Sequence, residues 1–221
     1  MSPELTASLP QRVAGLLQRL TYRRARDAAT FDLIGALRHR AYLAEGAIAP
    51  HASGQLRDSF DDAPNSATIG IWLDDTLVAS VRVLVVSYLH GTLSPAVEVF
   101  PELMTSAIGQ GKVILDPNRL VIDPQAARLW PDLIYAALRV PFIAAGHFAA
   151  DIVTATVRTE HLAFYRRKFG FHTVVGARPY PGLLKPLCLM IARSDISGPA
   201  ILDTLPFFDA RPFEAADMFD L

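Results

Sequence analysis

Two periodicities of hydrophobic positions run through the sequence, and they predict a series of helices and strands. Apolar residues recur at the spacing of an amphipathic helix over 9–20 and again over 31–42. The same spacing predicts a helix over 131–146, with Pro in its first turn, and one over 160–170, which ends at a Gly. The helix over 9–20 could pack on the domain or on a partner.

Short runs rich in β-branched residues predict the strands of a sheet. The runs 67–73 and 76–86 are separated only by Asp74 and Asp75, a pattern typical of an antiparallel hairpin. The polar residues 50–66 have the composition of a loop, and loops of this length are often functional. The other expected strands are 112–123, 151–158, 171–176 and 183–193. The mixture of helices and strands predicts an α/β fold class.

Composition indicates one folded domain with a separate tail. Hydrophobic residues make up 51% of the 221 residues and charged residues 19%, which is enough apolar material for a large core. We expect residues 1–193 to form a single domain that begins with an amphipathic helix and a basic segment over 1–28. Residues 194–221 form an acidic, Phe-rich tail that could be a lid, a partner-binding tail or a swapped arm.

Charge and residue usage exclude several classes of function. The formal net charge of −1 offers no basic field for nucleic acid or anionic lipid. The sequence has no uninterrupted apolar stretch of the roughly 18 residues that a membrane span needs, and no export signal, so we expect a cytoplasmic protein. The single Cys188 lies in an apolar run, which favours a buried packing role. The histidines show no metal-ligand spacing, so we expect no metal site.

Charged residues inside apolar strands are the candidate chemistry. Arg82 and Arg119 each need a carboxylate partner, either Asp58 or Asp61 of the polar loop or the carboxylate of an amino-acid acceptor. Asp116 is a candidate general base, because a carboxylate beside an apolar run can be partly desolvated. The alternative is that Asp116 pairs with Arg119 or caps the following turn.

The stretch 157–176 resembles the late strand–helix–strand unit of the GCN5-related N-acetyltransferase (GNAT) superfamily. Its most specific part is FYRRKFGF, residues 164–171, with an aromatic pair, a basic helix end and then Gly-Phe. The aromatic side chains of this part can pack under the sheet, and Gly170 can end the helix in a left-handed turn. The resemblance implies a mixed, mostly antiparallel central sheet flanked by helices.

A closer resemblance, over roughly residues 31–181, is to the N-acyl amino acid synthases and the related acyl-homoserine-lactone synthases. It rests on four pieces in the same order: LRHRAY (37–42), RDSFDD (57–62), LVASVRVL (77–84) and DPNRLVIDP (116–124). Asp116 stands where those relatives usually have Glu, and Val83 stands where their strand has Leu. The resemblance implies catalytic roles for Asp116 and Arg119. It implies organising or substrate-binding roles for Arg38, Tyr42, Asp58, Asp61 and Arg82, to which we add Thr156 from its strand position.

The resemblance implies an N-acyltransferase that moves a medium or long acyl chain from a thioester to the α-amine of an amino acid or analogue. General acetyltransferases have a Gly-rich loop for the coenzyme A pyrophosphate, whereas residues 121–130 contain no Gly. This favours acyl carrier protein over coenzyme A as the donor, with no further cofactor. Alternatives are a lactone synthase using S-adenosylmethionine and a non-catalytic acyl- or lipid-binding module.

Two small basic clusters are candidate docking sites for an acidic carrier protein. They are Arg23, Arg24 and Arg26 near the N-terminus and Arg166, Arg167 and Lys168 at the end of the helix over 160–170. The sequence leaves open the acceptor amino acid, the length of the acyl chain and the oligomeric state.

Overall fold

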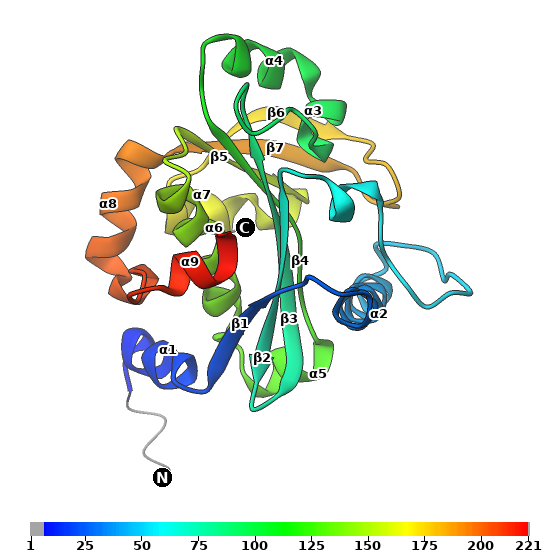
Figure 1. The fold of residues 1–221 in the computed structure, drawn as a ribbon, viewed down its shortest axis with the longest axis vertical. Helices are drawn as coiled ribbons and strands as arrows, with labels where there is room; N and C mark the ends of the chain where they lie inside the picture. Colours follow the sequence, from blue (N-terminus) through cyan, green and yellow to red (C-terminus); the bar gives the residue numbers. More distant parts are fainter. Residues whose placement is uncertain (1–6, 221) are drawn as a thin grey trace.

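A seven-stranded sheet runs through the protein in a computed structural model that describes residues 7–220 (Figure 1). The strand order is β1-β2-β3-β4-β5-β7-β6, and all neighbours are antiparallel except β4 and β5, which are parallel. The strands are β1 (Leu20–Arg24), β2 (Ser66–Leu73), β3 (Thr76–Val86), β4 (Ile114–Ile122), β5 (Ile152–Val157), β6 (His172–Arg178) and β7 (Leu187–Arg193). The predicted fold class, with a mixed and mostly antiparallel sheet, is confirmed.

Helices cover both faces of the sheet (Figure 1). One face carries α2 (Ala28–Ala44), and the other carries α1 (Leu9–Leu17), α6 (Leu133–His147) and α9 (Glu214–Phe219). The period-2 alternation of β3 separates the two environments, because Val81 and Val83 enter the α6 core while Arg82 points to the α2 side. The remaining helices are α3 (Pro95–Val99), α4 (Pro101–Gly109), α5 (Pro124–Leu129), α7 (Leu162–Phe169) and α8 (Ser194–Thr204), with 3₁₀ turns η2 (Ser59–Asp62), η3 (Thr159–His161) and η4 (Pro206–Phe208).

A bulge in β4 opens the sheet at its centre. Arg82 pairs with Asn118 and Ser80 pairs with Val121, so β4 supplies one residue more than β3 over this stretch. Arg119 lies in the bulge with a φ of +52°, an uncommon conformation for a residue other than Gly. Within residues 7–220, the β4–β5 ladder consists of the pairs Ile114–Ile152 and Leu115–Val153. Beyond Leu115 and Val153, the described parts of β4 and β5 form no backbone pairs with each other.

Part of the segment described from the sequence only as basic is a strand. Residues Leu20–Arg24 form β1, which pairs with β2 along its whole length. Leu20 and Tyr22 face the core and the intervening Thr21 and Arg23 face solvent, so the segment alternates like a strand despite its charge. Helix α5 was not predicted either; the Asp123 carboxylate caps it by accepting hydrogen bonds from the backbone N–H groups of the next residues.

The C-terminal tail folds back onto the domain of its own chain. Arg139 of α6 is fully buried and donates to the backbone carbonyls of Phe207 and Asp209, each at 2.6 Å. The same guanidinium makes a two-point ion pair with Glu214 at 2.5 and 2.9 Å. One buried charge thus anchors Phe207, Asp209 and Glu214 to α6. In the described part of the chain, no helix is both long and apolar enough to cross a membrane.

Replacing Glu214 with Ala is expected to lower the free energy of unfolding by about 3–5 kcal/mol, because Arg139 would lose its buried carboxylate partner. Burial alone would raise the pKa of Glu214, but hydrogen bonds from Arg139 and Arg211 outweigh it and lower the pKa to about 2. A lowered pKa stabilises the fold fully above the unfolded value of 4.5, and this stabilisation is lost as the pH falls toward 2.

Urea unfolding of wild type and Glu214→Ala between pH 7 and pH 3 measures both effects, and the difference between the two proteins should shrink at low pH. The exposed pair Arg193–Asp195 provides the control, since Asp195→Ala should change stability little. A small, pH-independent effect of Glu214→Ala would contradict this account of the tail.

Candidate active site

The cavity at the opening between β4 and β5 has a volume of about 1630 Å³. Its lining comes from α2 and residues 56–60 on one side of the sheet and from α6, α7 and α8 on the other, so the cavity crosses the sheet through the opening. Ligand sites for drug-sized molecules usually measure about 300–1,000 Å³. This cavity therefore has room for a long substrate or for two substrates together.

Three arginines and two aspartates meet at the end of the cavity beside α2. Arg38 donates to both oxygens of Asp61 at 2.8 and 2.9 Å. Arg82 lies between the two carboxylates, 2.5 Å from Asp58 and 3.1 Å from Asp61. Arg119 donates to Asp58 at 2.7 Å. These five residues come from α2, η2 with its cap, β3 and β4, so the cluster joins four separate parts of the chain.

The cluster keeps its carboxylates ionised. Burial would raise the pKa of Asp58, but Arg82 and Arg119 outweigh burial and lower the pKa to about 2. Burial is likewise outweighed at Asp61, where Arg38 and Arg82 lower the pKa of the carboxyl. The predicted partnership of Arg82 and Arg119 with the loop aspartates is thus present in the structure. The three guanidinium groups carry one positive charge more than the two carboxylates neutralise.

Asp116 lies just behind the cavity wall and is only 1% exposed. Its carboxylate accepts hydrogen bonds from Ser94 Oγ at 2.5 Å and Thr154 Oγ1 at 2.8 Å, and from the backbone N–H of Ala96 in α3 at 3.3 Å. Burial raises the pKa of this carboxyl, and the hydrogen bonds from Ser94 and Thr154 oppose the rise. Asp116 therefore helps to cap α3, and it is Asp58, in place of Asp116, that pairs with Arg119.

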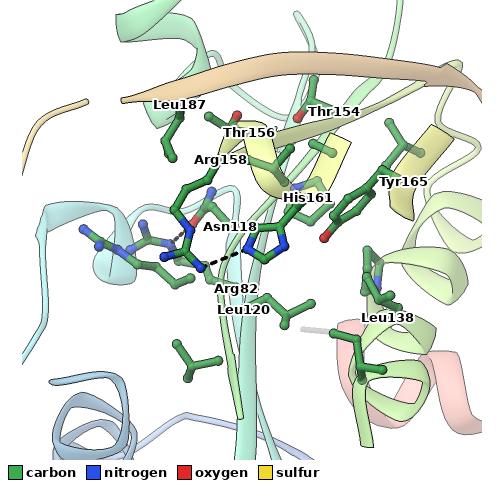
Figure 2. Close-up of a pocket in the computed structure, with 18 of the residues that line it drawn as sticks. Arg82, Asn118, Leu120, Leu138, Thr154, Thr156, Arg158, His161, Tyr165 and Leu187 are labelled. Atoms are coloured by element: carbon green, nitrogen blue, oxygen red, sulfur yellow. Dashed lines mark hydrogen bonds between the residues drawn. The ribbon is translucent and has the colours of Figure 1, made fainter. Parts of the chain in front are cut away.

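Asn118 and Thr156 reach the cavity from the two separated strands (Figure 2). Asn118 Oδ1 accepts a hydrogen bond from Arg82 Nε at 2.8 Å, and its amide nitrogen lies 3.3 Å from Asp116 Oδ2. Thr156 Oγ1 is buried without a hydrogen-bond partner among the described residues. A buried hydroxyl without a partner is costly unless a ligand supplies one. The Thr156 hydroxyl is thus free to form a hydrogen bond with a polar group in the cavity, and its predicted role in substrate binding stays a prediction.

Tyr42 and Tyr180 complete the polar end of the cavity. Tyr42 of α2 lies against Arg119, with the guanidinium carbon 5.6 Å from the ring centre. Tyr180 was not predicted as a site residue. It lies in the loop between β6 and β7, and burial together with the Asp116 charge raises the pKa of its hydroxyl. The Tyr180 phenol can therefore act as a hydrogen-bond donor to a ligand at neutral pH.

Three further residues that the sequence did not single out as site residues form the middle of the cavity (Figure 2). Arg158, at the end of β5, donates to His161 Nε2 at 2.9 Å and pairs with Glu45 of the C-cap of α2 at 3.0 Å. Figure 2 shows the hydroxyl of Tyr165 directed into the cavity on the side of His161. Burial raises the pKa of Tyr165 to about 12. An Arg directly after an apolar strand was the available signal for Arg158.

The other arm of the cavity is apolar and lies between the sheet and α6, α7 and α8. Leu138 and Phe142 line it from α6, and Phe164 and Phe169 line it from α7. The predicted packing of Phe164 and Phe169 below the sheet is present, and Tyr165 between them serves the cavity as well. The cavity therefore joins a charged end to a hydrophobic arm. Across residues 7–220, no cluster of three or more His, Cys, Asp or Glu side chains is placed to hold a metal ion.

The same architecture occurs in solved structures of acyltransferases. FeeM, an N-acyl amino acid synthase from uncultured soil microbes, matches with a TM-score of 0.69 and 16% identity over 86% of this chain and 99% of its own. The acyl-homoserine-lactone synthase LasI matches with a TM-score of 0.58 and 12% identity over 80% of this chain and 92% of its own. The coenzyme A-dependent acyl-homoserine-lactone synthase BjaI matches with a TM-score of 0.57 and 15% identity over 85% of this chain and 90% of its own. At these identities, the likenesses show the fold.

The sheet and its flanking helices have the GNAT-like fold of these structures. The family model of the N-acyl amino acid synthase FeeM matches residues 34–193, and the chain belongs to this family. The resemblance noted in the four sequence pieces is thereby confirmed. None of the curated proteins matches the chain.

Replacing Asp116 with Asn is expected to become less destabilising, or more stabilising, relative to wild type as the pH rises. Because burial raises the pKa of Asp116, the folded state holds the proton of this carboxyl more tightly than the unfolded chain does. Its contribution to stability is full below the unfolded pKa of 3.8 and is lost as the pH rises through the folded value. Asn does not ionise, so the stability of the variant relative to wild type should increase as the pH rises from 4 to 8, as measured by urea unfolding.

Asp61→Asn is the matched control, because Asp61 is also a buried aspartate but has a lowered pKa. Its loss leaves Arg38 without a buried partner and should cost about 3–5 kcal/mol at pH 7. If the stability of Asp116→Asn relative to wild type did not increase between pH 4 and pH 8, burial would not raise the pKa of Asp116, contrary to this account.

Proposed function

We propose that this acyltransferase moves a medium or long acyl chain from a thioester to the α-amine of an amino acid or close analogue. The observation that carries the proposal is the single cavity that joins an arginine-rich end to an apolar arm through the opening between β4 and β5. The arginine-rich end suits the charged groups of an amino acid, and the apolar arm suits an acyl chain. The thioester would lie between them, beside Asn118 and Thr156.

The charge of the polar end supports an acceptor that carries a carboxylate. Arg38, Arg82 and Arg119 carry three positive charges against the two negative charges of Asp58 and Asp61. A buried charge without a partner is strongly unfavourable, whereas an arginine and a carboxylate form short, charge-assisted hydrogen bonds. The α-carboxylate of an amino acid would neutralise the remaining charge and hold the α-amine next to the opening in the sheet.

Two side chains are suited to the proton transfers. The amine must lose a proton before it attacks the thioester, and Asp116, with its raised pKa, is the proposed acceptor of that proton. Because Asp116 lies behind the wall, the proton would reach it through a hydroxyl such as that of Thr154, which lines the cavity and donates to Asp116. The hydroxyl of Tyr165 has a pKa of about 12, so it stays protonated at neutral pH and can donate to the departing thiolate.

A donor held by its pantetheine arm fits the opening better than one held by a pyrophosphate. The edges of β4 and β5 that face the opening can pair with the amides of an extended arm. The backbone N–H groups at the start of α5 are already bonded to the Asp123 carboxylate, which would also repel a pyrophosphate. We therefore propose acyl carrier protein as the preferred donor and no cofactor besides the acyl thioester.

Incubation of the pure protein with acyl carrier proteins loaded with octanoyl to stearoyl chains, pooled amino acids and S-adenosylmethionine should yield an N-acyl amino acid, detected by mass spectrometry. Tyr165→Phe keeps the ring and removes the hydroxyl, and it should lower kcat by roughly 100-fold or more. An acyl lactone in place of the N-acyl amino acid would assign the protein to autoinducer synthesis. Absence of any product from acyl carrier protein and from coenzyme A donors would indicate a binding module.

Reversing the charges of Arg166 and Arg167 to Glu is expected to raise KM for the carrier-bound donor roughly tenfold at low salt, with little change in kcat and none with acyl-coenzyme A. These residues are exposed at the end of α7 and make no ion pair within residues 7–220. The control is the other basic cluster, where Arg23 already pairs with Asp75, so Arg23→Glu should leave KM unchanged. Steady-state kinetics at two salt concentrations measures the effect, and an unchanged KM for the α7 variant would contradict docking there.

A further inference from the structure

The C-terminal segment forms the wall of the apolar arm that lies farthest from α2. Ile201 and Leu202 of α8 and Phe208 of η4 line the cavity. Figure 1 shows α8 on the opposite side of the molecule from α2, whose residues form the charged end. The match to the family model ends at residue 193, so this wall comes from a part of the chain that the model does not cover.

Aromatic contacts join this wall to the rest of the arm. Phe208 is 1% exposed and packs edge-on against Phe142 of α6, with ring centres 5.3 Å apart, and against Phe169 of α7 at 5.7 Å. Leu205 and Ile201 belong to the same buried cluster. The wall is therefore part of a close-packed core, which does not yield easily to a longer ligand.

Arg139 fixes the position of the wall. Its guanidinium binds the carbonyls of Phe207 and Asp209 on either side of Phe208, as well as the Glu214 carboxylate. The buried charge of Arg139 would lose all these partners if the segment moved away. The end of the apolar arm is thus set by a rigid element and not by a mobile lid.

We propose that this segment determines the longest acyl chain the enzyme accepts, with Leu202 as the side chain that the end of the chain meets. The inference rests on the proposed acyl transfer. Leu202 lines the cavity but is only partly buried, so its size can change without removal of a core residue. A chain one methylene too long for a rigid apolar pocket is discriminated against by about 10- to 200-fold.

The test uses Leu202→Trp and Leu202→Ala, with kcat/KM measured for acyl carrier proteins carrying chains from octanoyl to stearoyl. Leu202→Trp should lower kcat/KM for the longest chains used by wild type by about tenfold or more and leave the shortest unchanged. Leu202→Ala should move the preference toward longer chains. Matched controls are Ile196→Trp and Ile196→Ala, since Ile196 lies on the same helix, is 61% exposed and does not line the cavity.

A second readout separates this inference from the proposed function. The increase in Tm produced by free fatty acids of the same lengths reports binding without turnover. If the fatty-acid length that raises Tm most changes in the Leu202 variants but not in the Ile196 variants, the inference is supported even when no donor turns over. The lack of turnover would then overturn only the proposed acyl transfer. Turnover with the same length profile in all four variants would overturn the inference alone. Absence of both turnover and fatty-acid binding would overturn both.

Discussion

The separation of β4 from β5 is the structural constraint on which the site depends. Two parallel strands that stayed paired would close the sheet, and the charged residues on one side would have no connection to the apolar arm on the other. The bulge of β4 against β3 holds Arg119 in a left-handed conformation, and the ladder between β4 and β5 has already ended after Leu115 and Val153. The cavity exists because backbone pairing between these strands stops.

Burying so many charges is possible because each of them has a partner of opposite charge within the cluster. Arg38 on α2, Arg82 on β3 and Arg119 on β4 would each be costly alone in a core, and the η2 region supplies the two carboxylates that they share. The same interactions hold the polar loop against the sheet. The cluster thus closes one side of the cavity and also leaves a positive charge facing it.

The tail repeats this principle on the opposite face. Arg139 inside α6 is a buried charge that binds two carbonyls and one carboxylate of residues 207–214. A helix that would otherwise be almost wholly apolar therefore specifies one position for the C-terminal segment. Together, the two arginine networks fix the charged end and the hydrophobic end of the same cavity, although they lie far apart in the sequence.

The sequence by itself predicted the main strands and helices, because hydrophobic spacing is a local property. It also pointed to the residues of the charged cluster, because the four sequence pieces occur in the same order as in the related synthases. It did not reveal β1, whose alternation is masked by Arg23 and Arg24, nor the part played by Tyr165, whose hydroxyl is polar while its ring packs. Only the tertiary structure decided that Asp58 and not Asp116 pairs with Arg119, and that the tail lines the cavity. Both depend on contacts between residues more than 60 positions apart, which no local pattern encodes.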